Sequence, residues 1–168
     1  MILVTVGTHE QPFDRLVRAA ADLAGDEPVV VQYGSSAIAH GRGEWFDYLS
    51  FDELAEYARQ ARVFVCHAGV GSIVLARRNG HRPVVVPRRH HLGEHVDDHQ
   101  LSLATRLGGA GVVTVLEDPA SLGSLVREQA STAPEDAPNA LPGPDALGGA
   151  IRGLLTDLGT APRTARAA

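Results

Sequence analysis

Short runs of consecutive apolar residues alternate, over the first 130 residues, with stretches in which apolar positions recur every three or four residues. A continuous apolar run between turn residues is typical of a strand buried on both faces, whereas the wider spacing is typical of an amphipathic helix. The alternation predicts an α/β fold, a Rossmann-like parallel sheet with helices on both faces. The expected strands are 1–6, 29–33, 63–66, 83–86 and 111–116, with a short extended piece at 45–49, and the expected helices begin near residues 12, 51, 72, 94 and 119.

The boundaries of several helices can be predicted from local signals. Pro12 suits the first position of a helix, because its missing N–H is not needed there. Ser50 and Glu53 have the spacing of a capping box. The fourth helix is expected over 94–107 and the fifth over 119–129, from their apolar spacing.

The character of the sequence changes after the first 130 residues, which we expect to form one domain. Residues 131–145 are rich in Pro, Ala, Gly and acidic residues, which is typical of a linker. Residues 146–158 have the apolar stripe of one more helix, and 159–168 have the composition of a disordered tail.

Composition narrows the classes of protein that fit. The net charge of −5 gives no support for a nucleic-acid-binding surface. The single cysteine, Cys66, cannot form an internal disulfide, and all 15 basic residues are arginine, so mechanisms that need a lysine are excluded. We expect no signal peptide and no membrane span, and therefore a cytoplasmic protein.

Two glycine turns follow expected strands and are candidate phosphate sites. Gly69, Val70, Gly71 and Ser72 open a helix, and amides at a helix start attract anions. A turn of this kind also uses glycine for backbone geometry alone, and both interpretations stay open. The turn after the first strand is similar and contains Gly7, Thr8 and His9, where His9 is a base, a phosphate donor or a helix cap.

The loop after the strand 83–86 holds the densest polar cluster. Carboxylates, imidazoles and amides in such a loop suit the hydroxyls of a sugar, although a solvated helix start explains acids equally well. We expect no metal site, because His95 and His99 would share a helix face but spacing places no third ligand. The cluster consists of His90, His91, Glu94, His95, Asp97, Asp98 and His99.

Two further groups have alternative uses. Arg88 and Arg89 directly follow a strand, where they either neutralise a diphosphate or lie as exposed charges on the rim. The aromatic residues before the second helix either flank a nucleobase or fill the core. They are Trp45, Phe46, Tyr48 and Phe51.

These motifs together resemble the C-terminal, donor-binding domain of glycosyltransferase family 28. Three segments carry the resemblance, 4–13, 67–72 and 93–100, and the similarity covers residues 1–118. The chain is most similar to short chains of bacterial exopolysaccharide synthesis and to the catalytic subunit of dolichol-linked N-acetylglucosamine transfer. The resemblance implies half of a GT-B fold, a UDP-sugar donor such as UDP-N-acetylglucosamine or UDP-glucose, and inverting hexosyl transfer without a metal or other cofactor. It also implies a membrane-anchored partner subunit that holds a lipid-linked saccharide acceptor and keeps this chain at the inner face of the membrane.

The resemblance also assigns roles to residues. Gly7, Thr8 and His9 would face the diphosphate, the backbone at Phe51 would meet the base, and Asp98, His99 and Gln100 would bind the donor sugar. The motif containing His67 and Gly69 would offer the amides of Val70 and Gly71 and the hydroxyl of Ser72 to the phosphates. Related enzymes hold the ribose with an acid in the following helix, but residues 73–77 contain none. Glu94 and Asp97 are the candidate substitutes.

Three functional hypotheses follow. The first is a catalytic subunit in which His9, or a group on the partner, deprotonates the acceptor. The second is a non-catalytic module that binds a nucleotide sugar, an alternative that the missing ribose acid keeps open. The third is an interaction protein whose glycines serve only as turns.

Overall fold

The computed structural model describes the whole chain apart from residues 24, 26, 38–40, 132–147 and 150–168. Its centre is a parallel sheet of six strands in the order β3-β2-β1-β4-β5-β6. This confirms the α/β class that the continuous apolar runs predict. The strands are β1 (Ile2–Thr5), β2 (Val29–Gln32), β3 (Glu44–Phe46), β4 (Val63–His67), β5 (Val84–Val86) and β6 (Thr114–Val115).

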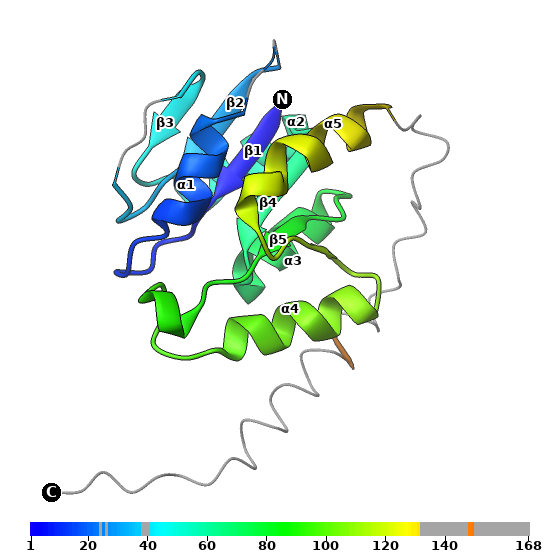
Figure 1. The fold of residues 1–168 in the computed structure, drawn as a ribbon. Helices are drawn as coiled ribbons and strands as arrows, with labels where there is room; N and C mark the ends of the chain where they lie inside the picture. The colour runs from blue at the N-terminus through cyan, green and yellow to red at the C-terminus, as the bar shows by residue number, and fades with distance from the viewer. Residues whose placement is uncertain (24, 26, 38–40, 132–147, 150–168) are drawn as a thin grey trace, which may run out of the picture.

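Helices cover both faces of the sheet, with α1 and α5 on one face and α2, α3 and α4 on the other (Figure 1). Alternate residues of β1 enter the two cores: Ile2 and Val4 pack with α1 and α5, and Leu3 packs with the other three helices. Both faces of the sheet are therefore buried, which is why the strand sequences are apolar throughout. The helices are α1 (Asp14–Ala21), α2 (Phe51–Gln60), α3 (Val70–Arg78), α4 (His99–Gly109) and α5 (Leu122–Ser131), with 3-10 turns η1 (His90–Leu92) and η2 (Pro119–Ser121).

The strand order reverses direction at the centre of the sheet. From β1 the chain moves outward to β3 on one side, and from β4 it moves outward to β6 on the other. Leu3 of β1 pairs with both Val30 of β2 and Phe64 of β4. The loops after β1 and β4 therefore leave neighbouring strand ends for opposite faces, and ligands of open α/β sheets bind at such a switch point.

The short extended piece expected near residue 45 is a true strand, because Val30 and Gln32 of β2 pair with Glu44 and Phe46 of β3. The capping box of α2 is confirmed. Ser50 Oγ accepts from the backbone of Glu53, and the Glu53 carboxylate accepts from the backbone of Ser50.

The expected helix over 94–107 is wrong in its first turn. Helix α4 begins at His99, and residues 94–98 are not helical. The cause is tertiary, because Glu94 is held by its carbonyl and by its carboxylate to side chains of other segments, as described below. The fifth helix also begins later than expected, since Pro119–Ser121 forms the 3-10 turn η2.

Several expectations lie beyond the described residues. The predicted linker from residue 132 onward, the predicted helix 146–158 apart from residues 148 and 149, and the tail 159–168 are all in this class. Among the helices that the structure describes, none combines the length and apolar character that a bilayer crossing requires.

Candidate functional site

A cleft of about 360 Å³ opens at the carboxyl ends of the central strands. It lies at the switch point, with residues from the ends of β1, β2 and β4 in its wall and the first turn of α3 at one side. The cleft is lined by Thr5, Gly7, Thr8, Gln32, Tyr48, Leu49, Phe51, Leu54, His67, Gly71, Ser72 and Leu75. The sequence places several of these in candidate motifs, and the fold brings them together.

A larger hollow of about 520 Å³ lies elsewhere, on the outer side of α1. Its lining residues are partly charged and include Arg15 and Glu94, which are paired with each other. None of its lining residues belongs to a strand. We therefore assign the ligand site to the smaller cleft, because the ends of three strands and the first turn of α3 line it.

The first turn of α3 presents backbone donors without a competing acceptor. Its N-cap is Gly69, which has no side-chain cap, and the first turn contains no acidic residue. A Cβ built on Gly71 would meet no atom within 4 Å, so this glycine leaves open space above the helix start. Unpaired amides at the positive end of a helix dipole, next to open space, form an anion site.

The other two motif glycines are required by the packing of His67. A Cβ on Gly7 would lie 2.5 Å from Cε1 of His67, and one on Gly69 would lie 2.1 Å from its Nε2. Gly7 also has a φ of +74°, which side-chain-bearing residues rarely adopt. The imidazole of His67 thus sits between the two turns and fixes their separation.

The imidazole of His67, which separates the two glycine turns, is uncharged at pH 7. Burial, reinforced by the positive charge of Arg88, lowers the pKa of His67 to about 4. Its Nδ1 is buried without a hydrogen-bond partner among the described residues. The ring lines the cleft but supplies no positive charge to a phosphate.

Sequence reasoning missed the polar floor of the cleft. The Thr5 hydroxyl donates to Oε1 of Gln32 across 2.6 Å and accepts from the backbone of Gly7 at 3.2 Å. Both side chains are buried. The available signal was a polar residue at the end of each of two otherwise apolar strands.

The rim of the cleft beside α2 is aromatic and exposed. Tyr48 and Phe51 are each more than 60% exposed although they are large apolar side chains. Both line the cleft. They provide a flat surface for a nucleobase, whereas Trp45 and Phe46 pack against the cores.

Arg88 has a structural role that the sequence does not predict. The residue is fully buried, so it is not an exposed rim charge, and both of its terminal nitrogens donate to backbone carbonyls. Nη1 donates to the carbonyls of Gln11 (2.7 Å) and Glu94 (2.9 Å), and Nη2 donates to the carbonyl of Val6 (2.8 Å). The guanidinium, 4.8 Å from the ring centre of Phe13, ties the loop after β1 to the loop after β5.

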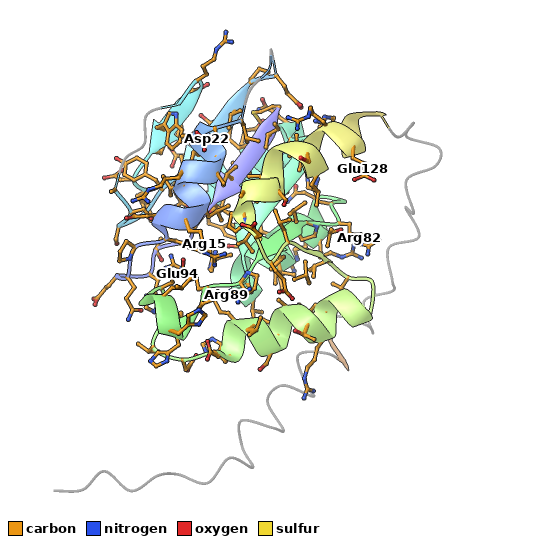
Figure 2. All side chains as sticks on the ribbon, viewed as in Figure 1. Arg15, Asp22, Arg82, Arg89, Glu94 and Glu128 are labelled. Carbon is orange, nitrogen blue, oxygen red and sulfur yellow. The ribbon has the colours of Figure 1, made fainter. Side chains whose placement is uncertain are left out.

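Glu94 is not a substitute for the missing ribose acid. Its two carboxylate oxygens accept from Nε and Nη2 of Arg15, both at 2.9 Å, and one also accepts from the backbone of Arg89. Figure 2 shows Arg15 and Glu94 pointing toward each other between α1 and the loop. Glu94 is buried and lines the outer hollow rather than the cleft.

A second polar group, made of His9, His95, Asp97 and His99, lies outside the wall of the cleft. The ring of His9 lies 4.6 Å from that of His95, which lies 4.7 Å from that of His99. Asp97 contacts both His95 and His99. The series of rings joins the loop after β1 to the start of α4.

The two neighbours of His99, Asp98 and Gln100, hold the backbone in place. Oδ1 of Asp98 accepts from the backbone of His90 at 3.0 Å, and Oε1 of the buried Gln100 accepts from the backbone of Arg88 at 3.3 Å. The backbone of Gln11 donates to Nδ1 of His9 at 3.3 Å. In the neutral ring this places the proton of His9 on Nε2.

The sequence matches one protein family over most of its length. The model of the glycosyltransferase family 28 C-terminal domain matches residues 1–141. The chain belongs to this family. No curated protein sequence matches it significantly.

Solved structures support the fold of the family 28 domain. One is the crystal structure of CalG4, the calicheamicin glycosyltransferase (21% identity, TM-score 0.56), which matches over 98% of this chain and 43% of its own length. Another is the glycotransferase of kitacinnamycin (24% identity, TM-score 0.55), matched over 92% of this chain and 38% of its own. The chain therefore has the fold of the C-terminal half of GT-B glycosyltransferases, and it spans less than half of either neighbour.

Proposed function

We propose that this domain binds the nucleotide-sugar donor of a glycosyltransferase and is the catalytic subunit of a two-component enzyme. The observation that carries the proposal is the uncapped first turn of α3, which opens beside Gly71 into the cleft at the switch point. A diphosphate fits this place, because helix amides favour an anion and the glycine allows close approach.

The two ends of the donor would then lie on either side of the diphosphate. The exposed rings of Tyr48 and Phe51 would hold the base of a UDP-sugar, and the second polar group, with Asp98, His99 and Gln100, would hold the sugar hydroxyls. No carboxylate lines the cleft among the described residues. Ribose recognition would therefore use the polar floor at Thr5 and Gln32 rather than an acid.

The proposed reaction is direct, inverting transfer of a hexosyl group to a lipid-linked saccharide, with no metal required. The acceptor oxygen forms a bond to the anomeric carbon while the bond to the diphosphate breaks, and the nucleoside diphosphate leaves. Helix amides stabilise the negative charge that develops on it. His9 or a group on a membrane-anchored partner subunit takes the proton of the acceptor.

A titration of the chain with UDP, UDP-N-acetylglucosamine, UDP-glucose and a GDP-sugar, in EDTA, tests donor binding. Selective binding of one UDP-sugar supports the proposal and identifies the donor. Binding of none of the four, by a chain shown to be folded by circular dichroism, would contradict donor binding by this chain alone.

The absence of a carboxylate from the described wall of the cleft favours a second candidate, a nucleotide-sugar-binding module without catalytic activity. The two candidates differ in turnover. Binding without transfer, when acceptor and partner subunit are both present, would favour the module, whereas release of nucleoside diphosphate would favour the enzyme.

A further inference from the structure

Three possible metal ligands converge in the loop before α4. They are the side chains of His95, Asp97 and His99, each of which offers one ligand atom, and these three atoms lie within 4.8 Å of one another. From the sequence we expect no third ligand for the two histidines, because their spacing places none. The non-helical backbone of 94–98 places Asp97 between them instead.

We propose that His95, Asp97 and His99 bind a divalent transition-metal ion, with Zn²⁺ as the best match, and that the ion competes with the donor sugar. Two imidazole nitrogens and one carboxylate oxygen form a donor set that suits zinc and does not suit magnesium, which prefers oxygen ligands. Zinc bonds to such atoms are about 2.0–2.2 Å long, so neighbouring ligand atoms of a tetrahedron lie about 3.3 Å apart. Nδ1 of His95 and Oδ1 of Asp97 are 3.2 Å apart.

His95 and Asp97 contact each other where a metal would bind. Nδ1 of His95 lies 3.2 Å from Oδ1 of Asp97. The backbone N–H of Asp97 donates to the same nitrogen at 3.4 Å, which is a long hydrogen bond. A metal bound through Nδ1 of His95 would replace this bond, because a neutral imidazole nitrogen has one lone pair.

The three side chains differ in exposure. The side chain of His95 is 6% exposed and lies against the ring of His9, whereas those of Asp97 and His99 are 54% and 37% exposed. One ligand is thus buried and two lie at the surface, where the close contact between Asp97 and His99 would open to admit the ion. Solvent can supply the fourth ligand.

Competition with the donor rests on the proposed function. His99 is one of the residues proposed to bind the sugar, and Asp97 contacts it directly. A bound metal would take the nitrogen of His99 and the carboxylate of Asp97, so sugar hydroxyls would lose these partners. The metal would therefore inhibit donor binding and would have no part in the transfer.

Calorimetric titration of the untagged full chain with ZnCl₂ tests the site directly, without any donor. We expect binding of one ion per chain, no response to MgCl₂, and at least about tenfold weaker zinc binding in His95→Ala, Asp97→Asn and His99→Ala. His91→Ala is the matched control, because His91 is exposed in η1 and outside the cluster. It should bind zinc as the unchanged chain does.

The absence of zinc binding, or equal loss of affinity in the His91 and His99 variants, would overturn the proposal. Circular dichroism of each variant excludes unfolding as the cause. A second titration, with the UDP-sugar in EDTA and then in saturating zinc, tests competition. Zinc binding without any donor binding would contradict the proposed function instead, so the two failures are distinguishable.

Discussion

Arg15 forms two hydrogen bonds of 2.9 Å with Glu94, from Nε and Nη2 to the two carboxylate oxygens. Arg15 belongs to α1, whereas Glu94 lies in the loop between η1 and α4. The same guanidinium also donates to the carbonyls of Pro87 and Glu117. This pair, together with Arg88, fixes the loop after β5 against the loop after β1, which is where the two halves of the proposed donor site meet.

Glu94→Gln should therefore destabilise the domain by about 1–3 kcal/mol, because it leaves a largely buried guanidinium without its anion. Glu117→Gln is the matched control. The side chain of Glu117 is 73% exposed and lies 3.5 Å from Arg89, so its loss should change little. Urea unfolding of both variants measures the difference, and equal effects would show that the Arg15–Glu94 pair is not a major clamp.

Arg88→Met should cost at least about 3 kcal/mol of folding stability, or prevent folding, because three backbone carbonyls, two of them in buried hydrogen bonds, lose their donor. Arg89→Met is the natural comparison, since Arg89 is the next residue and its side chain forms a peripheral ion pair with the exposed Glu117. Thermal unfolding should give a large decrease in Tm for Arg88→Met and a small one for Arg89→Met. The reverse order would contradict the clamp that we describe.

The sequence predicts the fold well where local patterns and tertiary structure agree. Continuous apolar strands predict a sheet buried on both faces, and the capping box of Ser50 and Glu53 marks the start of α2 correctly. The prediction from sequence fails at residues 94–98, where the apolar spacing and the early acidic residues are typical of a helix start. Contacts from Arg15 and Arg88, far away in the sequence, hold the backbone at Glu94 and override that local preference.

Gly69→Ala should destabilise the domain by about 1–3 kcal/mol through a clash with His67 rather than through backbone strain. The φ of Gly69 is −85°, which alanine accepts, but a Cβ would lie 2.1 Å from Nε2 of His67. A double-mutant cycle with His67→Ala isolates this clash. The cost of Gly69→Ala should be smaller in the His67→Ala background, and simple additivity of the two variants would argue against the packing described here.

His67 predicts a pH dependence of stability. Its pKa falls from 6.5 in the unfolded chain to about 4 in the native state, so below pH 6.5 the unfolded state binds more protons. Stability from the neutral ring is complete above pH 6.5 and is lost as the pH falls toward 4, by about 3 kcal/mol in total. Urea unfolding at pH 7 and pH 4 measures the free energy of unfolding of the unchanged chain and of His67→Gln. The difference between the two chains should change by about this amount between the two pH values. A pH-independent difference would place His67 in a more solvated site.

The candidate site was predictable only in part. The glycine turns and the polar loop are visible in the sequence, because strand ends of a parallel sheet meet at one edge. The role of Arg88 was not, since nothing local distinguishes it from the adjacent Arg89. The polar floor of Thr5 and Gln32 was also missed, because each is a single residue at the end of an apolar strand and only the sheet brings them together.

The central claim is that the first turn of α3 binds the diphosphate of the donor, and Gly71→Ala tests it most directly. The methyl group would meet no protein atom, so the fold should be unaffected, but it would occupy the space above the helix amides. Gly109→Ala, at the end of α4 and equally free of neighbours, is the control. Calorimetric titration with the UDP-sugar in EDTA should show at least about tenfold weaker binding for Gly71→Ala and unchanged binding for Gly109→Ala. Equal affinities in both variants would contradict a diphosphate site at this helix.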